Sequence, residues 1–470
     1  MIEASSIRKN KICLSDYDYA KDIENRLLMA QFSILDLEVL AELLYSSLKI
    51  PIRKLANNLD IDNSELLPIL DKISRTRLLT YDEDFVFVDK DMRKYYEMQI
   101  VKFDDDFKPG MEFLQGLLRK VPIHVLPAWY SIPRTSNNIF DSLVEKYLLT
   151  PQIFQRYLSE LNFGDPILSE IAQDVYESPD LKLFSSTIVE KYKLSREQFE
   201  EYMLYLEFNF VCCLWYNLRD EHWQEVVTPF YEWGEYLRFL RHTEVKSIAK
   251  TAKIMIKDAE EFTFIKHLSV ILALAKKQPI PLTIDKKGCH LKKSDYESIV
   301  EKSKIDLAFI ERLIEKLCLL KLSNVVEGHL HALASASDWL EMTLENRALF
   351  LYRHPLNRLI SENLPFHIPM ERSVHEAEKS VLRVLQSGWV LYDDFIKGVL
   401  VSLSDASTVT LKKTGKLWKY SLPTYSDEEK TLIKETIFHW LPEMGMVATG
   451  TYEGQDCFTL TPFGRDFFGT

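Results

Sequence analysis

The sequence predicts a mainly α-helical protein with short β-hairpins, built from tandem winged-helix (helix-turn-helix) domains. Glycine (14) and proline (18) together reach only about half their usual share of a 470-residue chain, which favours helices over a loop-rich sandwich or barrel. Apolar residues recur at helical spacing along most of the chain. One order of elements also recurs: helix, short gap, helix, turn, helix and two short strands, which is the order of a winged helix.

The clearest copy of this pattern covers residues 31–103. The apolar periodicity predicts three helices in it, over residues 34–44, 52–59 and 64–73. Ile50–Pro51 interrupts the pattern after the first helix, and Ser64 can cap the third. Two β-prone runs flank the polar turn Asp82–Asp84 and predict a wing hairpin.

A second copy is predicted over residues 165–245 and a third over residues 246–345. In the second copy Ser195 caps the third helix, and the runs 210–216 and 223–227 predict the wing. In the third copy Pro279–Leu282 is expected to be a short extended link. Asp306 is expected to cap its third helix, before wing strands at 319–326 and 329–333.

A fourth, less regular copy is predicted over residues 346–470. It carries an insertion at 411–423, before a helix that Ser426 and Glu429 open with capping-box spacing. Thr461–Phe463 repeats the Thr-Pro-Phe of the second copy, at the point where a last strand turns into a helix. The remaining segments are predicted to be an N-terminal tail and a helical connector, residues 1–30 and 104–164.

The residue pattern of the sequence predicts no targeting signal. Charged residues are spread through the first 30 positions, so the apolar core of a signal peptide is missing. The longest uncharged tract near the middle, Phe208–Leu218, is far shorter than the ~20 residues that span a bilayer. The six cysteines include no CxxC pair, which predicts buried thiols in a reducing, cytoplasmic compartment. No membrane partner is expected.

Charge differs sharply between the copies, although the whole chain has a net charge of −12. Residues 139–240 contain eight basic and eighteen acidic residues, and the third helix there is expected to repel phosphate through Glu197, Glu200, Glu201 and Glu207. The third helix of the first copy ends in Lys72, Arg75 and Arg77. Residues 246–321 are the exception, with sixteen basic and ten acidic residues, a net of +6.

Clusters of lysine are therefore the candidate nucleic-acid contacts. The second helix of the third copy is expected to begin and end with lysines, and the insertion of the fourth copy places others around Trp418 and Tyr420, where basic and aromatic side chains together suit backbone contact and base stacking. The candidates are Lys286, Lys287, Lys292, Lys293, Lys302, Lys304, Lys412, Lys413, Lys416 and Lys419. Lysine dominates over arginine, so base-specific readout is not expected. The alternative is a solvated lysine face that keeps the protein soluble.

One stretch resembles a known family. Ser337-Asp338-Trp339-Leu340, followed by Glu345, Arg347 and Leu351-Tyr352-Arg353, is similar to a stretch that follows a winged helix in bacterial helicase-associated proteins, which resemble the N-terminal region of XPB-type helicases. The ending Phe458–Arg465 resembles their closing wing, a strand followed by Thr-Pro-x-Gly-Arg. The likeness covers residues 262–470 and implies an accessory role near DNA. It implies no ATPase, because the chain lacks a GxxxxGK[ST] loop.

Enzymatic and metal motifs are weak. His329 and His331 alternate on an expected strand and could form a zinc site with Cys289 or Cys318, but such pairs are more often structural. Cys212–Cys213 lies in an apolar run and is expected in the core. HExxH, GxSxG and GxGxxG do not occur. No cofactor, metal or small-molecule substrate is therefore expected.

Two functions fit these patterns. The first is a non-enzymatic nucleic-acid-associated accessory or regulatory protein that contacts the DNA backbone through its lysine-rich third copy. The alternative is a protein-interaction scaffold whose winged helices dock partner proteins without binding DNA, which the acidic overall balance favours. DNA and a protein partner are thus the two expected classes of ligand.

Overall fold

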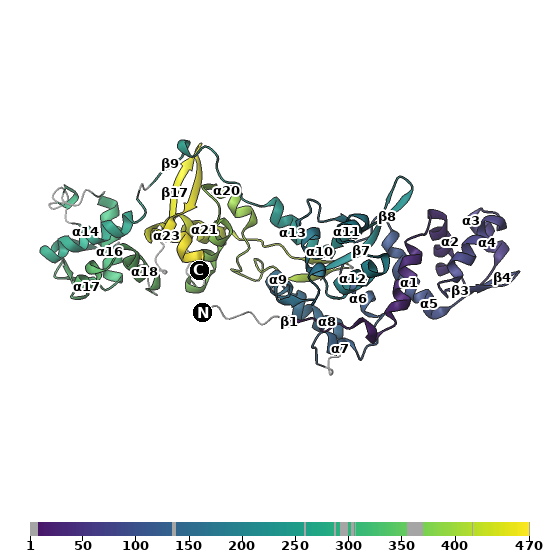
Figure 1. The fold of residues 1–470 in the computed structure, drawn as a ribbon. Helices are drawn as coiled ribbons and strands as arrows, with labels where there is room; N and C mark the ends of the chain where they lie inside the picture. The colour runs from purple at the N-terminus through teal and green to yellow at the C-terminus, as the bar shows by residue number, and fades with distance from the viewer. Residues whose placement is uncertain are drawn as a thin grey trace. The chain divides into compact units, whose positions relative to one another are not determined.

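The computed structural model describes residues 8–133, 138–257, 260–285, 288–291, 299–301, 305, 307–354, 370–415 and 417–469. Helices dominate these residues, and the strands form small sheets that are antiparallel except for one two-stranded pair, so the prediction of a mainly helical chain with short hairpins is confirmed (Figure 1). The chain forms two compact units. Unit one is Met1–Arg238 with Thr410–Ser421, and unit two is Phe239–Val409 with Leu422–Thr470.

Repeat one lies in unit one and follows the predicted order of elements. Its elements are α2 (Ile34–Tyr45), β2 (Lys49–Pro51), α3 (Ile52–Leu59), α4 (Asn63–Ser74), β3 (Leu79–Tyr81) and β4 (Phe85–Val88). The sheet order is β2-β4-β3. Ser33 and Asp36 form a capping box at the start of α2. Ser64 was expected to cap the third helix, but α4 already begins at Asn63 and its N-cap residue is Asp62.

Repeat two, also in unit one, has the same order of elements. They are α10 (Pro166–Glu177), β6 (Leu183–Phe184), α11 (Ser185–Tyr192), α12 (Arg196–Phe208), β7 (Cys212–Arg219) and β8 (His222–Pro229), with sheet order β6-β8-β7. Ser195 caps α12 as expected, with Gln198 completing a capping box. Helix α13 (Tyr231–His242) follows the last strand after the Thr-Pro-Phe sequence.

The expected tail and connector are more structured than the sequence indicates. Within residues 1–30, η1 (Leu14–Asp16) and α1 (Tyr19–Met29) are helical, and β1 (Arg8–Lys9) pairs with β5 (Leu161–Asn162). The connector contains the short helix α7 (Leu126–Trp129). The other connector helices are α6 (Met111–Leu118), α8 (Ile139–Leu143), η3 (Val144–Leu148) and α9 (Pro151–Glu160). Helices α5 (Lys90–Ile100) and η2 (Val101–Phe103) precede the connector and end the first predicted copy.

Repeat three, in unit two, has one more strand than predicted. Its described elements are α14 (Thr263–Lys277), β10 (Ile280–Asp285), β11 (Gly288–Leu291), α16 (Leu307–Leu319), β12 (Ser323–Val326) and β13 (His329–Ala332). The sheet order is β11-β10-β13-β12. Pro279–Leu282 was expected to be a link, but strand β10 begins there and pairs with β11. Residue Asp306, expected to cap the third helix, lies outside the described residues. Helices α17 (Ser335–Glu341) and α18 (Leu344–Arg353) follow.

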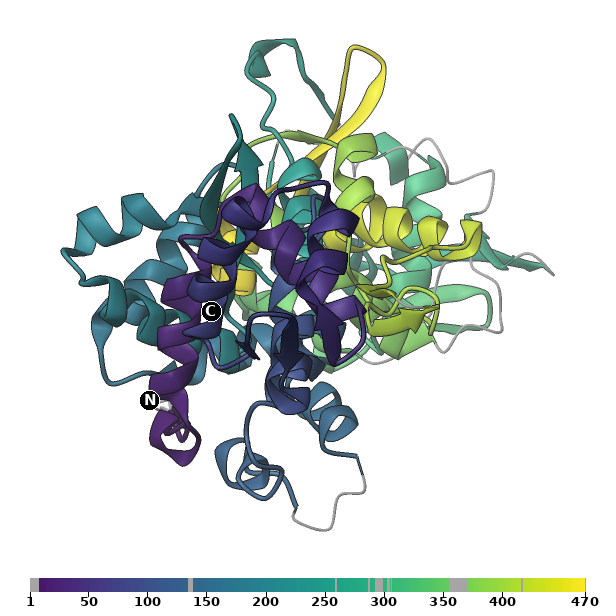
Figure 2. The ribbon, with the colours of Figure 1, turned by 90° about the vertical axis from the view of Figure 1, so that its right-hand side faces the viewer.

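Repeat four completes unit two and contains more short helical turns than predicted. Its elements are α19 (Met370–Glu378), η7 (Lys379–Val384), β14 (Val390–Leu391), α20 (Tyr392–Phe395), η8 (Ile396–Gly398), α21 (Asp427–Glu435), η9 (Thr436–Trp440), α22 (Leu441–Glu443), β17 (Val447–Tyr452), β18 (Gln455–Leu460) and α23 (Pro462–Gly469). The predicted capping box of Ser426 and Glu429 is confirmed. The sheet order is β14-β18-β17-β9, where β9 (Met255–Ile256) comes from the segment after η4 (Thr251–Lys253). The tip of hairpin β17–β18 projects from the helices, with the β9 segment beside it (Figures 1 and 2).

The four repeats share details that their sequences do not display. In the main sheet of each repeat, the repeat's own first strand pairs with its last strand, so that the last strand is central. A residue with positive φ stands two positions before the penultimate strand in each repeat: Arg77, Phe210, Lys321 and Gly445. In three repeats the next amide then donates back to the carbonyl five residues earlier: Val211 to Leu206, Leu322 to Leu317, and Met446 to Leu441. This is the hydrogen bond of a Schellman helix end.

Each unit has its own apolar interior. Repeats one and two contribute separate clusters in unit one, while the apolar residues of repeats three and four form one continuous cluster in unit two. None of the described helices is long and apolar enough to cross a membrane.

Candidate nucleic-acid interface

The structure describes three of the ten predicted lysines. Lys412, Lys413 and Lys419 are exposed on the hairpin of β15 (Leu411–Thr414) and β16 (Leu417–Tyr420). The other seven lie outside the described residues: Lys286, Lys287, Lys292, Lys293, Lys302, Lys304 and Lys416. The lysine-rich third repeat therefore stays a prediction from sequence, and the geometry of the candidate interface comes from this hairpin.

The two faces of hairpin β15–β16 differ in character. Lys412 is directly opposite Lys419 in the antiparallel register. Because alternate side chains of a strand point to opposite faces, these two lysines share the outer face with Leu417, whose side chain is also exposed. Leu411 and Tyr420 form the opposing pair on the inner face, and both are buried.

The inner face packs against the connector helices of unit one. The hydroxyl of Tyr420 donates to the carbonyl of Leu148 at 2.8 Å, and the amide of Leu411 donates to the carbonyl of Leu149 at 2.7 Å. Trp418 meets Phe140 edge-to-face with ring centroids 6.0 Å apart. These contacts fix the hairpin on unit one, although its sequence lies within the C-terminal repeat.

The outer face is an electrostatically costly arrangement in the free protein. Like charges directly opposite each other in an antiparallel pair are destabilising. Among the residues described, no ion pair joins Lys412, Lys413 or Lys419 to a carboxylate; Lys413 lies only over the Trp418 ring, at 5.9 Å. An anion between Lys412 and Lys419 would relieve the repulsion, and a phosphate backbone supplies anions at regular intervals.

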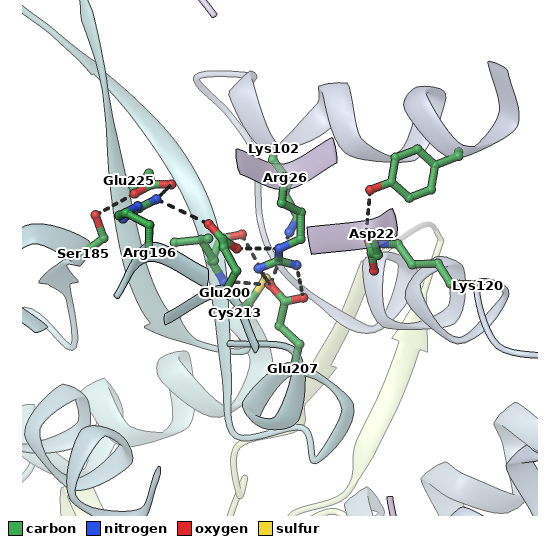
Figure 3. A network of polar contacts seen from close by, with 12 residues as sticks. Asp22, Arg26, Lys102, Lys120, Ser185, Arg196, Glu200, Glu207, Cys213 and Glu225 are labelled. Atoms are coloured by element: carbon green, nitrogen blue, oxygen red, sulfur yellow. Dashed lines mark hydrogen bonds and ion pairs between the residues drawn. The ribbon is translucent and has the colours of Figure 1, made fainter. Parts of the chain in front are cut away.

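The third helix of repeat two does not present the acidic surface that its sequence indicates. Glu200 and Glu207 on α12 are completely buried beside Arg26 of α1, as Figure 3 shows. Nε of Arg26 donates to Oε2 of Glu200 at 2.6 Å, and Nη1 donates to Oε2 of Glu207 at 2.8 Å. The prediction that these two glutamates repel phosphate at the surface is therefore wrong. Glu197 is exposed and Glu201 half-buried, as that prediction required.

Further cations complete this buried network. Nζ of Lys102 donates to Glu207 at 3.2 Å, and Arg196 bridges Glu200 to Glu225. Burial alone would raise the pKa of Glu207, but Arg26 and Lys102 lower it to about 2. Burial raises the pKa of Glu200, and Arg26 only partly offsets that effect. The network thus holds charged groups out of water, and removing one member is expected to destabilise the fold strongly.

A second buried pair lies beside the first. The carboxylate of Asp22 on α1 accepts from Nζ of Lys120 at 2.9 Å and from the hydroxyl of Tyr95 at 2.5 Å. Burial would raise the pKa of Asp22, but Lys120 and Arg26 lower it. One signal in the sequence points to the first network: Glu207 interrupts a largely apolar run, and a lone charge there needs a partner. Arg26 follows Glu24 and Asn25 and carries no such signal.

The basic end of α4 in repeat one is only partly available. Nζ of Lys72 donates to Oδ2 of Asp36 at 2.6 Å and to the carbonyl of Gln31 at 2.7 Å. Arg75 pairs with Asp71 at 3.5 Å, and both side chains are exposed. Lys72 is therefore engaged within repeat one. Arg75 and Arg77 are the other two cations of the basic end of α4.

Metal binding gains no support from the described residues. The rings of His329 and His331 lie 6.4 Å apart on β13, but the described part of the chain holds no group of three or more potential metal ligands. The side chain of Cys289 is not among the side chains that the structure describes. Cys212 and Cys213 are completely buried on β7, which confirms their predicted place in the core.

Packing accounts for the motifs that resemble helicase-associated proteins. The guanidinium of Arg347 lies over the buried Trp339 ring and donates to the carbonyl of the same residue at 3.1 Å. In the closing motif, Arg465 donates to the carbonyls of Leu385 and Ser387. These residues hold helices and strands together, so their side chains are engaged within unit two.

Comparisons with models of known protein families, with curated proteins and with solved structures found no match to this chain. The resemblance of residues 262–470 remains a prediction, and any functional proposal depends on the side chains described above.

Proposed function

We propose that the chain is a non-enzymatic nucleic-acid-associated accessory or regulatory protein built from four winged helices in tandem. The shared strand order of the four sheets supports this architecture, as does the left-handed residue that follows the third helix of each repeat. A helix–strand–helix–helix–strand–strand order of this kind is the winged-helix variant of helix-turn-helix.

The opposed pair of Lys412 and Lys419 carries the proposal of a nucleic-acid contact. The pair is exposed, lacks a carboxylate partner among the described residues, and stands on a hairpin fixed by its inner face. Lysine ammonium groups bind phosphate as point charges and read no base sequence. The proposed contact is therefore to the backbone. The lysines of repeat three are included in the proposed backbone contact because of their clustering in the sequence.

A salt titration tests this contact. Binding of duplex and single-stranded DNA would be measured by fluorescence anisotropy over a range of salt concentrations, for the full chain and for Lys412→Gln/Lys419→Gln. Removing one lysine that neutralises a phosphate should flatten the slope of log affinity against log salt by about 0.9 on duplex DNA. The matched control is Lys397→Gln/Lys430→Gln, which removes two exposed lysines that already pair with Asp394 and Asp427.

The expected outcome is a slope reduced by nearly two for the hairpin variant, if both lysines fully neutralise a phosphate. The control variant should keep the slope of the unmodified chain. Equal slopes in all three proteins would show that the hairpin lysines are only a solvated face, and no DNA binding at low salt would reject the nucleic-acid function itself.

The second candidate is a protein-interaction scaffold. It is favoured by the burial of one side of α12, because Arg26 holds that side of the helix that would enter a DNA groove within unit one. Under this function the repeats act as docking modules. Glu200 cannot serve as a docking charge in its buried position, so the acidic contact must come from exposed carboxylates elsewhere.

A further inference from the structure

Exposed apolar side chains gather in repeat one. Among the described residues, six large apolar side chains within residues 34–87 are exposed: Ile34, Tyr45, Leu48, Leu67, Tyr81 and Phe87. Tyr45 is 70% exposed and Phe87 38%. Single exposed apolar residues are ordinary on any protein, so the residues that share one face are the ones that bear on an interaction site.

The outer face of the sheet β2-β4-β3 carries part of this group. Phe87 is opposite Lys49 on one side and Thr80 on the other, while Phe85 is opposite Pro51. The alternate residues of the strands point into the core, so these side chains share the solvent face. The rings of Phe85 and Phe87 have centroids 6.4 Å apart.

An acidic turn borders this aromatic pair. Asp82, Glu83 and Asp84 join β3 to β4, and all three are exposed. The carboxylate of Asp82 accepts the amides of Asp84 and Phe85 at 2.9 and 2.8 Å, which fixes the turn. Within the part of the chain that the structure describes, no ion pair engages Glu83 or Asp84.

The two aromatic rings of this face already hold one cation of the chain itself. Nζ of Lys49 lies 4.0 Å from the ring centroid of Phe85 and 5.2 Å from that of Phe87. Ring faces attract cations through their quadrupole. The carboxylates of the adjacent turn add attraction for positive charge and repel phosphate, so neither nucleic acid nor an anionic membrane fits this face.

We propose that Phe85, Phe87 and the turn Asp82–Asp84 form a docking face for a partner protein segment that presents arginine or lysine next to an apolar side chain. The basic side chain lies against the carboxylates of Glu83 and Asp84, and the apolar one covers the exposed ring of Phe87. This inference rests on the scaffold function as the second candidate, and it is independent of any DNA contact by the hairpin lysines.

A defined peptide serves as the probe. An amphipathic peptide of arginine and leucine, labelled with a fluorophore, would be titrated with the full chain and with Phe87→Ser and Glu83→Gln. A peptide with glutamate in place of every arginine is the probe control. The protein control uses the wing of repeat two, where Leu218 is 37% exposed and Glu221 lies in the turn that follows its strand: Leu218→Ser and Glu221→Gln.

Phe87→Ser should weaken arginine-peptide binding about tenfold, because it removes the ring that the apolar side chain of the peptide covers. A tenfold change corresponds to about 1.4 kcal/mol of binding free energy. Glu83→Gln should weaken it about threefold and reduce its salt dependence, as expected for an exposed charge pair. The two control variants should bind like the unmodified chain, and the glutamate peptide should not bind. Circular dichroism verifies that each variant folds; Glu83 is an exposed turn residue, so its variant tests the face even if Phe87→Ser unfolds.

Two results would overturn the proposal. Equal binding by all four variants would show that the arginine peptide attaches elsewhere, which rejects this face but leaves the scaffold function in place. Failure of the arginine peptide to bind the unmodified chain would reject both the face and its basic partner. Neither result would affect the DNA titration, which depends on Lys412 and Lys419.

Discussion

Removing Arg26 should destabilise unit one severely, because this one side chain neutralises two buried carboxylates. In Arg26→Met the apolar stem is kept and the guanidinium is removed. Glu200 then keeps the half-exposed Arg196 as its cationic partner, and Glu207 keeps Lys102 and the amide of Leu214. Breaking a buried ion pair by deleting one partner typically costs about 3–5 kcal/mol. The lowered pKa of Glu207 gives a similar size: a shift from 4.5 to about 2 corresponds to about 3 kcal/mol at 1.36 kcal/mol per unit.

Urea unfolding followed by tryptophan fluorescence measures this destabilisation. The matched control is Arg238→Met, since Arg238 makes an exposed pair with Glu235 that is worth at most about 1 kcal/mol. Acid stability provides a second readout. The depressed pKa of Glu207 contributes stability above its unfolded value of 4.5, and this contribution is lost as the pH falls through about 2. In Arg26→Met the pKa of Glu207 should rise, so this loss of stability should be smaller and should end at a higher pH. A destabilisation below about 1 kcal/mol would refute the argument that the pair is held out of water.

Three further predictions follow from other parts of the chain. Burial raises the pKa of Glu232 from 4.5 to about 7. The contribution of this group to stability is therefore complete below pH 4.5 and is lost as the pH rises through 7. Glu232→Gln should flatten the dependence of the unfolding midpoint on pH between these two values. Gly464→Ala should lower the melting temperature of unit two by circular dichroism, because its Cβ would lie 2.0 Å from the carbonyl oxygen of Met446. Lys292→Gln/Lys293→Gln should flatten the salt slope of DNA binding by nearly two while the fold survives, and an unchanged slope would exclude both as phosphate contacts.

Local signals in the sequence predict many of the helices and hairpins. The three helices of repeat one, the cap at Ser195, the capping box at Ser426 and the hairpins all depend on residues within about a dozen positions of each other. The turn residues before each wing were not predicted. Arg77, Phe210 and Lys321 have positive φ, and none is the glycine that usually signals this conformation.

Pairings between segments far apart in the sequence cannot be predicted in this way, because they leave no local pattern. The hairpin β15–β16 reads as an insertion in repeat four, yet Tyr420 bonds to Leu148, 272 positions earlier. Strand β9 has only two residues, too few for a periodic pattern, and it forms only because β17 offers an edge. The candidate site was predicted in part: the aromatic and lysine residues of the hairpin were identified, while their division into an inner and an outer face required the register.

Counting charges along a sequence overstates how acidic a surface is when some charges pair across the fold. Glu200 and Glu207 are two of the carboxylates that give residues 139–240 their negative balance, and they are matched by Arg26 and Lys102, which lie outside that range. The surface of repeat two is therefore less repulsive to phosphate than its sequence indicates, because Arg26 of α1 pairs with two buried carboxylates of its third helix. In repeat one the carboxylates of the wing turn remain exposed. Repeats one and two thus differ in which carboxylates stay exposed, and the net charge of their sequences does not display that difference.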